Sequence, residues 1–287
     1  MIGDIFRTIL TYPILNLMVV LYHILFSNLG LAIIAITIIS RLALIPLTKT
    51  QTEMTRKMAQ LKPELDKLQE KYKNNPEKLS KEQMKLYKKV GYNPLGCLGT
   101  FIPQIIILSV LIGVVRAITN NNTEGIYEFV LNWVSNGTGN FTINPNFLGL
   151  DLTQTYTTLS GEFGRFAPQA VPYLVLALVV GVIQFITTKL TTALQNPEFV
   201  KSNKKKSKKD SSEPNMEDMQ ESMQKSMMFM FPLMTIFISI SAPAALGVYW
   251  ITQSIMLIVQ YFILDFDRSK KGIQNLFTQI KSKYGKK

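Results

Sequence analysis

One arginine stands inside a long apolar stretch of this sequence. Arg41 lies in the run ITIISRLALIPL, within the apolar stretch 29–48. An arginine near the centre of a membrane-spanning helix costs roughly 2.5–3.5 kcal/mol on insertion scales, so it normally faces a hydrated cavity or a buried partner. The alternative is that the side chain snorkels to the nearer membrane surface. The apolar stretches contain no Asp or Glu between their ends, so we expect a hydrated, positively charged recess around Arg41.

Other polar residues recur on faces of the apolar stretches. Thr37 lies four residues before Arg41, which places the two on one helical face. Each polar stripe alone is also explained by hydrogen bonds between helices, and that alternative stays open. Taken with Arg41, the stripes predict a polar groove inside the bundle. Its predicted residues are Arg41, Thr37, Gln104, Gln184, Tyr249 and Gln253.

Methionines follow a helical spacing between residues 216 and 234. Methionine is flexible and polarizable, and it is frequent on surfaces that bind varied apolar partners. The simpler explanation is packing of an amphipathic helix. The functional hypothesis is a surface along which apolar substrate segments slide, formed by Met219, Met223, Met227 and Met230.

Residue types needed for catalysis or metal binding are scarce. The 287-residue chain has one Cys, Cys97, and one His, His23, which excludes an internal disulfide and a Cys/His metal cluster. The motif NPLGCLG (93–99) lacks the lysine and the preceding strand of a phosphate-binding loop. We therefore expect no catalytic residues, no metal and no cofactor, and we predict that the protein is not an enzyme.

Apolar stretches of membrane-spanning length must position these residues. About 20 apolar residues in a helix cross the roughly 30 Å hydrocarbon core of a bilayer. We predict an all-α polytopic membrane protein with a five-helix transmembrane bundle. Three spans are expected at 29–48, 97–117 and 168–192, and two more within 226–265, joined by a tight turn at Ser241, Ala242 and Pro243.

Two further helical segments are predicted outside this bundle. Residues 1–28 contain an apolar helix with a narrow polar face, which favours a helix lying on the membrane surface over one that spans it. Residues 49–92 are charged, with apolar residues every three or four positions, which indicates a helical hairpin. Asn75 and Pro76 fit the start of its second helix.

Lys and Arg are distributed unequally between the connections. Segment 49–96 contains 12 of them, 118–167 contains one, and 190–225 and 266–287 contain seven each. The positive-inside rule therefore places the hairpin, the basic loop 193–225 and the basic tail in the cytoplasm, and 118–167 outside. Topology thus accounts for the net charge of +12, and we expect no DNA partner. Without a recognisable cleavable signal, a bacterial plasma membrane is the simplest location, with a cytoplasmic C-terminus.

Taken in order, these segments resemble the YidC family of membrane protein insertases, which has mitochondrial and chloroplast relatives. The matching stretches are ISRLALIPLTKTQTEMTRKMAQLKPELDKLQEKYKNNPEK (39–78), LYKKVGYNPLG (86–96), MMFMFPLM (227–234) and PAALGVYWITQSIMLIVQ (243–260). The resemblance implies a groove open to the cytoplasm and to lipid. Arg41 matches the family's groove arginine, and Gln104 and Tyr249 fall where groove-lining residues are expected.

The resemblance also implies a function. It predicts insertion and folding of integral membrane proteins without ATP hydrolysis, with nascent membrane proteins and the phospholipid bilayer as partners. The ribosome, the signal recognition particle receptor and the Sec translocon are further expected partners. Two rivals are a small-solute transporter, which usually shows internal repeats, and a structural assembly factor, which would tolerate replacement of Arg41 by leucine.

Overall fold

The computed structural model describes residues 7–72, 75–89, 91, 101–119, 124–138, 142–195 and 216–284. Within these ranges the chain is mostly helical and contains one two-stranded antiparallel sheet. Among the described residues, Arg7–Ile24, Val171–Leu194 and Ala244–Leu264 are long and apolar enough to cross a membrane. Leu29–Ala43 and Ile45–Met54 form an apolar pair bent by 55°, which is either one broken span or a re-entrant loop. The protein is therefore a helical membrane protein, as predicted, while a bundle of five spans stays a prediction.

The chain divides into two compact units that alternate along the sequence. Each is described by itself below. The first unit comprises Met1–Ala43, Pro103–Ile186 and Met230–Met256, and the second comprises Leu44–Ile102, Thr187–Phe229 and Leu257–Lys287.

The first unit begins with a helix that changes its winding. A short π-helix, η1 (Arg7–Thr11), continues directly as α2 (Tyr12–Ile24). The chain then turns at Phe26 and Ser27, whose φ angles are 58° and 51°, into α3 (Leu29–Ala43). The Asn28 side chain caps α3, because its Oδ1 accepts a hydrogen bond from Leu31 N at 3.0 Å. By length and composition the first of these helices could cross a membrane, so its predicted position on the surface stays a prediction.

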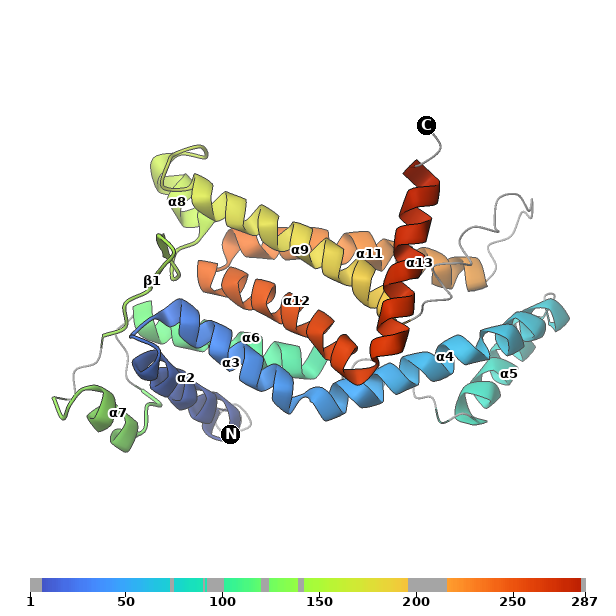
Figure 1. Ribbon diagram of the computed structural model, residues 1–287, viewed down its shortest axis with the longest axis horizontal. Helices are drawn as coiled ribbons and strands as arrows, with labels where there is room; N and C mark the ends of the chain where they lie inside the picture. Colours follow the sequence, from blue (N-terminus) through green and yellow to red (C-terminus); the bar gives the residue numbers. More distant parts are fainter. Residues whose placement is uncertain are drawn as a thin grey trace. The chain divides into compact units, whose positions relative to one another are not determined.

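Three neighbouring helices share the core of the first unit with α12 (Ala244–Leu264). They are α2, α3 and α6 (Phe101–Thr119), and Figure 1 shows α2 lying alongside α3. Buried side chains from these four helices form one apolar cluster, so α2 is part of this core and not a separate appendage. The members include Leu15, Met18, Val19, Ala32, Ile33, Val110, Val114, Leu246 and Tyr249.

Residues 118–167, predicted only as an outer loop, contain defined elements. These are α7 (Glu128–Val134), the strand pair β1 (Asn146–Phe147) and β2 (Leu150–Asp151), and α8 (Tyr156–Phe163). The strands are too short to give a strand pattern in a segment rich in Asn, Thr and Gly, which explains why the sequence did not predict them.

Asn16 of α2 is buried and bonded to this segment. Its Nδ2 donates to Gly125 O at 2.8 Å, and its Oδ1 accepts from Tyr127 N at 2.7 Å. Tyr22 adds a second tie, since its hydroxyl accepts from Asn144 N at 2.9 Å. A buried amide is tolerated only when it is hydrogen-bonded. Two polar residues of this helix therefore hold the segment that follows α6.

Glycines allow close approach of helices in the rest of the first unit. The helices are α9 (Val171–Gln195), α11 (Met216–Ser241) and α12. A Cβ at Gly181 of α9 would overlap Ile236 of α11, and one at Gly247 would lie 2.9 Å from Leu176 Cδ2. Small residues at such contacts are the common device for packing membrane helices. Helix α11 begins at Met216, whereas the fourth span was predicted from 226, because the methionine-rich approach continues the same helix.

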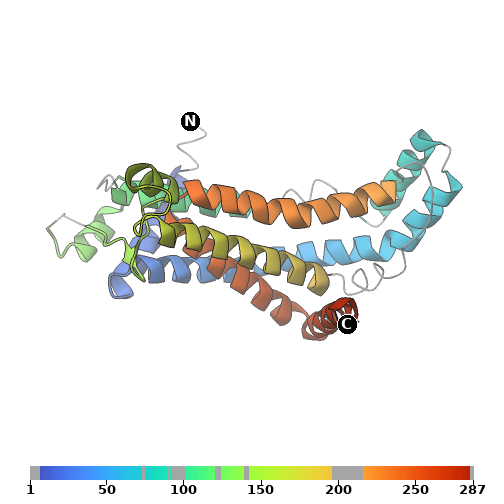
Figure 2. The same cartoon turned by 90° about the horizontal axis from the view of Figure 1, so that it is seen from above.

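The second unit contains the predicted hairpin. Helices α4 (Ile45–Lys71) and α5 (Pro76–Lys89) run back along each other, as Figure 2 shows. Asn75 caps α5 through a 3.0 Å hydrogen bond from Lys78 N to its Oδ1. The helix α4 starts inside the range 29–48, which was predicted as one continuous span. Pro46 explains the break, because proline has no backbone N–H and cannot donate the hydrogen bond that would continue α3. Proline is tolerated in the first turn of a helix, which is its position in α4.

The segment 266–287 was predicted as a basic tail with no element assigned to it, and it contains α13 (Phe266–Tyr284). Asp265 caps this helix, since its Oδ1 accepts from Arg268 N at 3.1 Å. Leu276 packs on Ala193 and Leu190 at the end of α9, and a Cβ on Gly272 would collide with the Ala193 backbone. These contacts fix α13 across the last turns of α9 (Figure 1).

Candidate functional site

Arg41 lies in the last turn of α3, and its side chain is half-buried. The helix ends two residues later at Ala43, so Arg41 stands near the helix C-terminus and not at the middle of a continuous span. A positive charge is favoured there by the partial negative charge of the unpaired carbonyl groups. The break at Leu44 thus lowers the cost of an arginine in an apolar helix.

Thr37 stands one turn before Arg41 but is bonded within its own helix. The Thr37 side chain is buried, and its hydroxyl donates to Ile33 O at 2.6 Å. Ser40 in turn donates to Thr37 O at 2.9 Å. These bonds satisfy polar side chains without a partner helix, so they keep the surface of α3 near Arg41 compatible with an apolar environment. A contact between Thr37 and substrate stays a prediction.

Gln184 joins two helices of the first unit. Ser254 Oγ of α12 donates to Gln184 Oε1 of α9 at 3.4 Å, and Ser254 is buried. This pair supports the interhelical hydrogen bonding that was the alternative to a groove for each polar stripe. Gln253, its neighbour in α12, is half-buried, and Tyr249, one turn earlier, is buried in the apolar core. Their place beside Arg41 in one groove stays a prediction.

The remaining predicted site residues fall partly outside the described side chains. Gln104 lies on α6, and Met219, Met223 and Met227 lie on α11, but their side chains are outside the described part of the structure. Met230 is described, and 63% of its surface is exposed.

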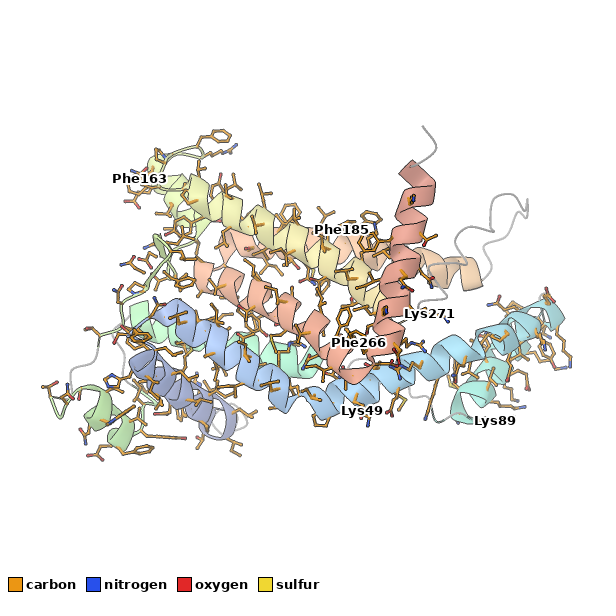
Figure 3. All side chains as sticks on the ribbon, in the orientation of Figure 1. Lys49, Lys89, Phe163, Phe185, Phe266 and Lys271 are labelled. Carbon is orange, nitrogen blue, oxygen red and sulfur yellow. The ribbon has the colours of Figure 1, made fainter. Side chains whose placement is uncertain are left out.

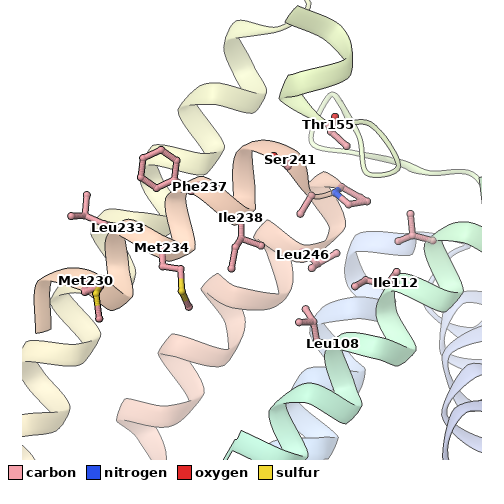
Figure 4. A pocket seen from close by; sticks show the side chains of 13 residues that line it. Leu108, Ile112, Thr155, Met230, Leu233, Met234, Phe237, Ile238, Ser241 and Leu246 are labelled. Atoms are coloured by element: carbon pink, nitrogen blue, oxygen red, sulfur yellow. The ribbon is translucent and has the colours of Figure 1, made fainter. Parts of the chain in front are cut away.

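An apolar pocket of about 880 Å³ opens between α6 and α11 in the first unit. Figure 4 shows Leu108 and Ile112 of α6 on one side and Met230, Met234 and Ile238 of α11 on the other. Thr155, Ser241 and the start of α12 complete its wall. Met230 and Met234 are one turn apart on α11, so part of the methionine pattern does reach this pocket.

The pocket is well suited to apolar chain segments. Its lining side chains are almost all aliphatic, aromatic or methionine, and several on α11 are largely exposed. A large exposed apolar patch on a protein marks a binding site or a lipid-facing surface. The sequence analysis missed the α6 side of this pocket, because Leu108 and Ile112 are unremarkable members of an apolar stretch until their distant partners are known.

An ion pair in the second unit was also missed. Arg56 Nη2 of α4 lies 2.7 Å from Asp265 Oδ2, and the two side chains are 28% and 31% exposed. Asp265 is the residue between α12 and α13, and it also caps α13. One carboxylate therefore holds both the first helix of the hairpin and the start of α13. A signal was present, since an Asp directly after an apolar stretch and before an amphipathic pattern is typical of an N-cap.

Two charges on the hairpin surface form a local pair. Glu82 Oε1 accepts a 2.6 Å hydrogen bond from Lys85 Nζ, one turn later on α5. That bond lowers the pKa of Glu82 and raises the pKa of Lys85. In the part of the chain that the structure describes, no three His, Cys, Asp or Glu side chains are grouped to hold a metal ion.

Together these features define a class of protein, namely a helical membrane protein with an arginine near a helix break and an apolar pocket between two apolar helices. The chain matches the family described as 60Kd inner membrane protein over residues 20–271. It therefore belongs to that family, which confirms the resemblance stated from the sequence.

Named relatives come from bacteria and chloroplasts. Membrane protein insertase YidC 2 of Bacillus anthracis is 29% identical over 272 residues, which cover 91% of this chain and 82% of the relative. Membrane protein insertase MisCA of Bacillus subtilis is 30% identical over 269 residues, covering 91% and 79%. ALBINO3-like protein 1, chloroplastic, of Arabidopsis thaliana is 29% identical over 259 residues, covering 90% and 47%. The chain thus spans about half the length of the chloroplast relatives it matches.

The Arg56–Asp265 pair generates a testable expectation. Asp265→Asn keeps an oxygen that can cap α13 but removes the charge, whereas Arg56→Gln removes the partner. For a pair that is about one-third exposed, we expect a coupling free energy of about 0.5–1 kcal/mol in a double-mutant cycle. Asp265→Ala should cost about 1 kcal/mol more than Asp265→Asn, because the cap is lost as well. The measurement is the free energy of unfolding in mixed detergent micelles.

The matched control is the Glu82–Lys85 pair, with the substitutions Glu82→Gln and Lys85→Gln. Because both residues lie on the surface of one helix, their coupling should be smaller than that of Arg56 and Asp265. Equal couplings for the two pairs would show that Asp265 does not link α4 to α13.

Proposed function

We propose that this protein inserts integral membrane proteins into the bilayer and helps them fold. The observation that carries the proposal is membership of a family whose bacterial members of similar length are named membrane protein insertases. The apolar pocket and the half-buried Arg41 add physical support, because an inserting chain has one apolar part and one polar part to accommodate.

The polar part of a substrate sets the barrier to insertion. A tail that must cross the hydrocarbon core loses its hydration, and each charged group costs several kcal/mol there. A groove that is hydrated and open to the cytoplasm shortens the dehydrated path. Arg41 provides the positive charge in that groove, with Thr37, Gln104, Gln184, Tyr249 and Gln253 as its proposed polar lining.

The apolar part of a substrate supplies the driving force. Burying about 20 apolar residues in lipid is favourable, since each buried CH₂ contributes about 0.8 kcal/mol. We propose that the pocket between α6 and α11 receives this segment before it moves into lipid, with Met230 at the edge and Met219, Met223 and Met227 continuing the path along α11. Insertion then needs no covalent step and no nucleotide.

The proposed setting follows from the charge distribution. The hairpin, the basic segment before α11 and α13 face the cytoplasm, and α7 and α8 lie outside, in a bacterial plasma membrane. Substrates are nascent membrane proteins. The ribosome, the signal recognition particle receptor and the Sec translocon are proposed partners that would deliver them to the cytoplasmic side.

Orientation can be tested directly by cysteine labelling in intact cells. With Cys97 replaced by Ser, a single cysteine at Thr142 should react with an impermeant thiol reagent added outside, and one at Lys78 should react only after lysis. A cysteine at Gly3 tests whether the first helix spans the membrane. It is labelled from outside if α2 lies on the outer membrane surface, and it is shielded if α2 spans the bilayer. Outside labelling at Lys78 would contradict the orientation and the groove that depends on it.

Arg41 can be tested with substrates that differ only in tail charge. Attraction between Arg41 and a substrate carboxylate is on the order of 4 kcal/mol at 4 Å for an effective dielectric constant of 20, before desolvation reduces it. If about 1 kcal/mol survives, Arg41→Ala should lower insertion of an acidic-tailed substrate roughly fivefold. Arg41→Lys should keep part of the activity, and Arg41→Glu should be worst for acidic tails.

The control variant is Lys49→Ala, which removes an exposed positive charge eight residues further along the chain. It should leave both substrates unaffected at matched expression. Equal losses for acidic and neutral tails in Arg41→Ala would show that Arg41 hydrates or shapes the groove without selecting charge. Full activity of all Arg41 variants would support the snorkelling alternative.

A further inference from the structure

Helix α13 begins where a membrane-spanning helix ends. Only Asp265 separates it from α12, whose 21 residues are long and apolar enough to cross a bilayer. At about 1.5 Å per residue such a helix covers the roughly 30 Å hydrocarbon core, so Leu264 reaches the membrane boundary. The first turns of α13 therefore lie at the level of the lipid headgroups.

One face of α13 is fixed to the protein. Ser269 and Leu276 are buried, Ser269 Oγ donates to Tyr261 O at 3.1 Å, and Gly272 lies against the Ala193 backbone. The Asp265 cap fixes its start. These contacts determine which face of α13 packs on the rest of the second unit and which faces stay exposed.

That other face carries two phenylalanines and two lysines in one line, which we call the Phe/Lys stripe. Phe266 is 62% exposed and Phe277 is 67% exposed, and Lys270 and Lys281 are exposed beside them. Their spacings of four, seven and four residues place all four within about 60° of one another around a helix of 3.6 residues per turn. Figure 3 shows Phe266 at the start of α13, next to the end of α12.

We propose that the Phe/Lys stripe binds the headgroup layer of anionic phospholipids. The phenyl rings enter the boundary of the acyl chains, and the ammonium groups meet lipid phosphates. This combination in one line is typical of helices that lie in the plane of a membrane surface. The proposal goes beyond insertion and does not rest on it, since it needs only that α12 spans the bilayer.

A polyanionic nucleic acid is the other chemistry that lysines attract. It would use Lys270 and Lys281, but it gives no reason for two exposed phenyl rings in the same stripe. Nearby charges on α13 lie off this line: Asp267 and Lys271 are about 70° and 110° from its centre, and Arg268 is about 170° from it. The position of the stripe beside the end of a span also favours lipid.

The test uses the full-length protein in vesicles of phosphatidylglycerol and phosphatidylcholine. Phe277→Trp places an indole on the stripe, and Thr278→Trp places one at the neighbouring exposed position outside it. Lipids brominated along the acyl chain then quench indoles at the membrane boundary. The parent protein supplies the background from Trp133 and Trp250.

We expect stronger quenching for Phe277→Trp than for Thr278→Trp in anionic vesicles, with a maximum for bromine near the headgroup end. Adding Lys270→Gln or Lys281→Gln should lower the equilibrium constant for stripe binding about fivefold per lysine, the factor for one near-surface charge. Phe266→Trp provides a second reporter should Phe277→Trp perturb the fold.

Three results would overturn the proposal. Equal quenching at Phe277→Trp and Thr278→Trp would show that the stripe has no special access to lipid. Quenching that is the same in pure phosphatidylcholine would exclude recognition of anionic headgroups. An indole that stays in water in every vesicle, and is shielded only when ribosomes are added, would assign the stripe to a nucleic-acid partner. Failure of insertion by the protein would leave all of these measurements unaffected.

Discussion

Polar groups in hydrocarbon must find partners inside the protein, and this constraint governs the whole arrangement. No water is available there to hydrogen-bond an exposed hydroxyl or amide. The apolar helices meet the requirement locally, because threonine hydroxyls donate hydrogen bonds to the carbonyl oxygen four residues earlier. These bonds run from Thr37 to Ile33 O, from Thr235 to Phe231 O and from Thr252 to Val248 O. Gln184 and Ser254 meet it between helices. Polar residues can therefore be spread over these helices without opening them to water.

Two full charges, Arg41 and Asp265, stand at helix breaks, where the same constraint is relaxed. Arg41 stands in the last turn of α3, just before the chain breaks at Leu44. Asp265 stands at the break between α12 and α13, where it pairs with Arg56 and caps the new helix. A break provides unpaired backbone groups and access to water, both of which lower the cost of a nearby charge. In the proposed mechanism the same property makes Arg41 available to a substrate.

The sequence predicted what depends on local pattern and missed what depends on distant partners. Arg41 with the charged hairpin and NPLG identified the family, and apolar run length identified a helical membrane protein. The α13 helix was missed because segment 266–287 was interpreted from its positive charge alone. The helical spacing of Ser269, Gly272 and Leu276 was not considered. The Arg56–Asp265 pair and the pocket between Leu108 and Met234 join residues far apart in sequence, which no periodicity reveals. Asn16 belongs to the narrow polar face predicted within residues 1–28, and its partners lie in a segment without pattern.

The central proposal is that this protein provides a path for a polar tail across the bilayer. The most direct measurement is insertion of a purified single-span substrate into liposomes that contain only this protein, scored by protection of its translocated tail from added protease. The account predicts that the protected fraction rises with the number of protein molecules per liposome. Equal protection in protein-free liposomes of the same lipid, or none at any protein density, would contradict it.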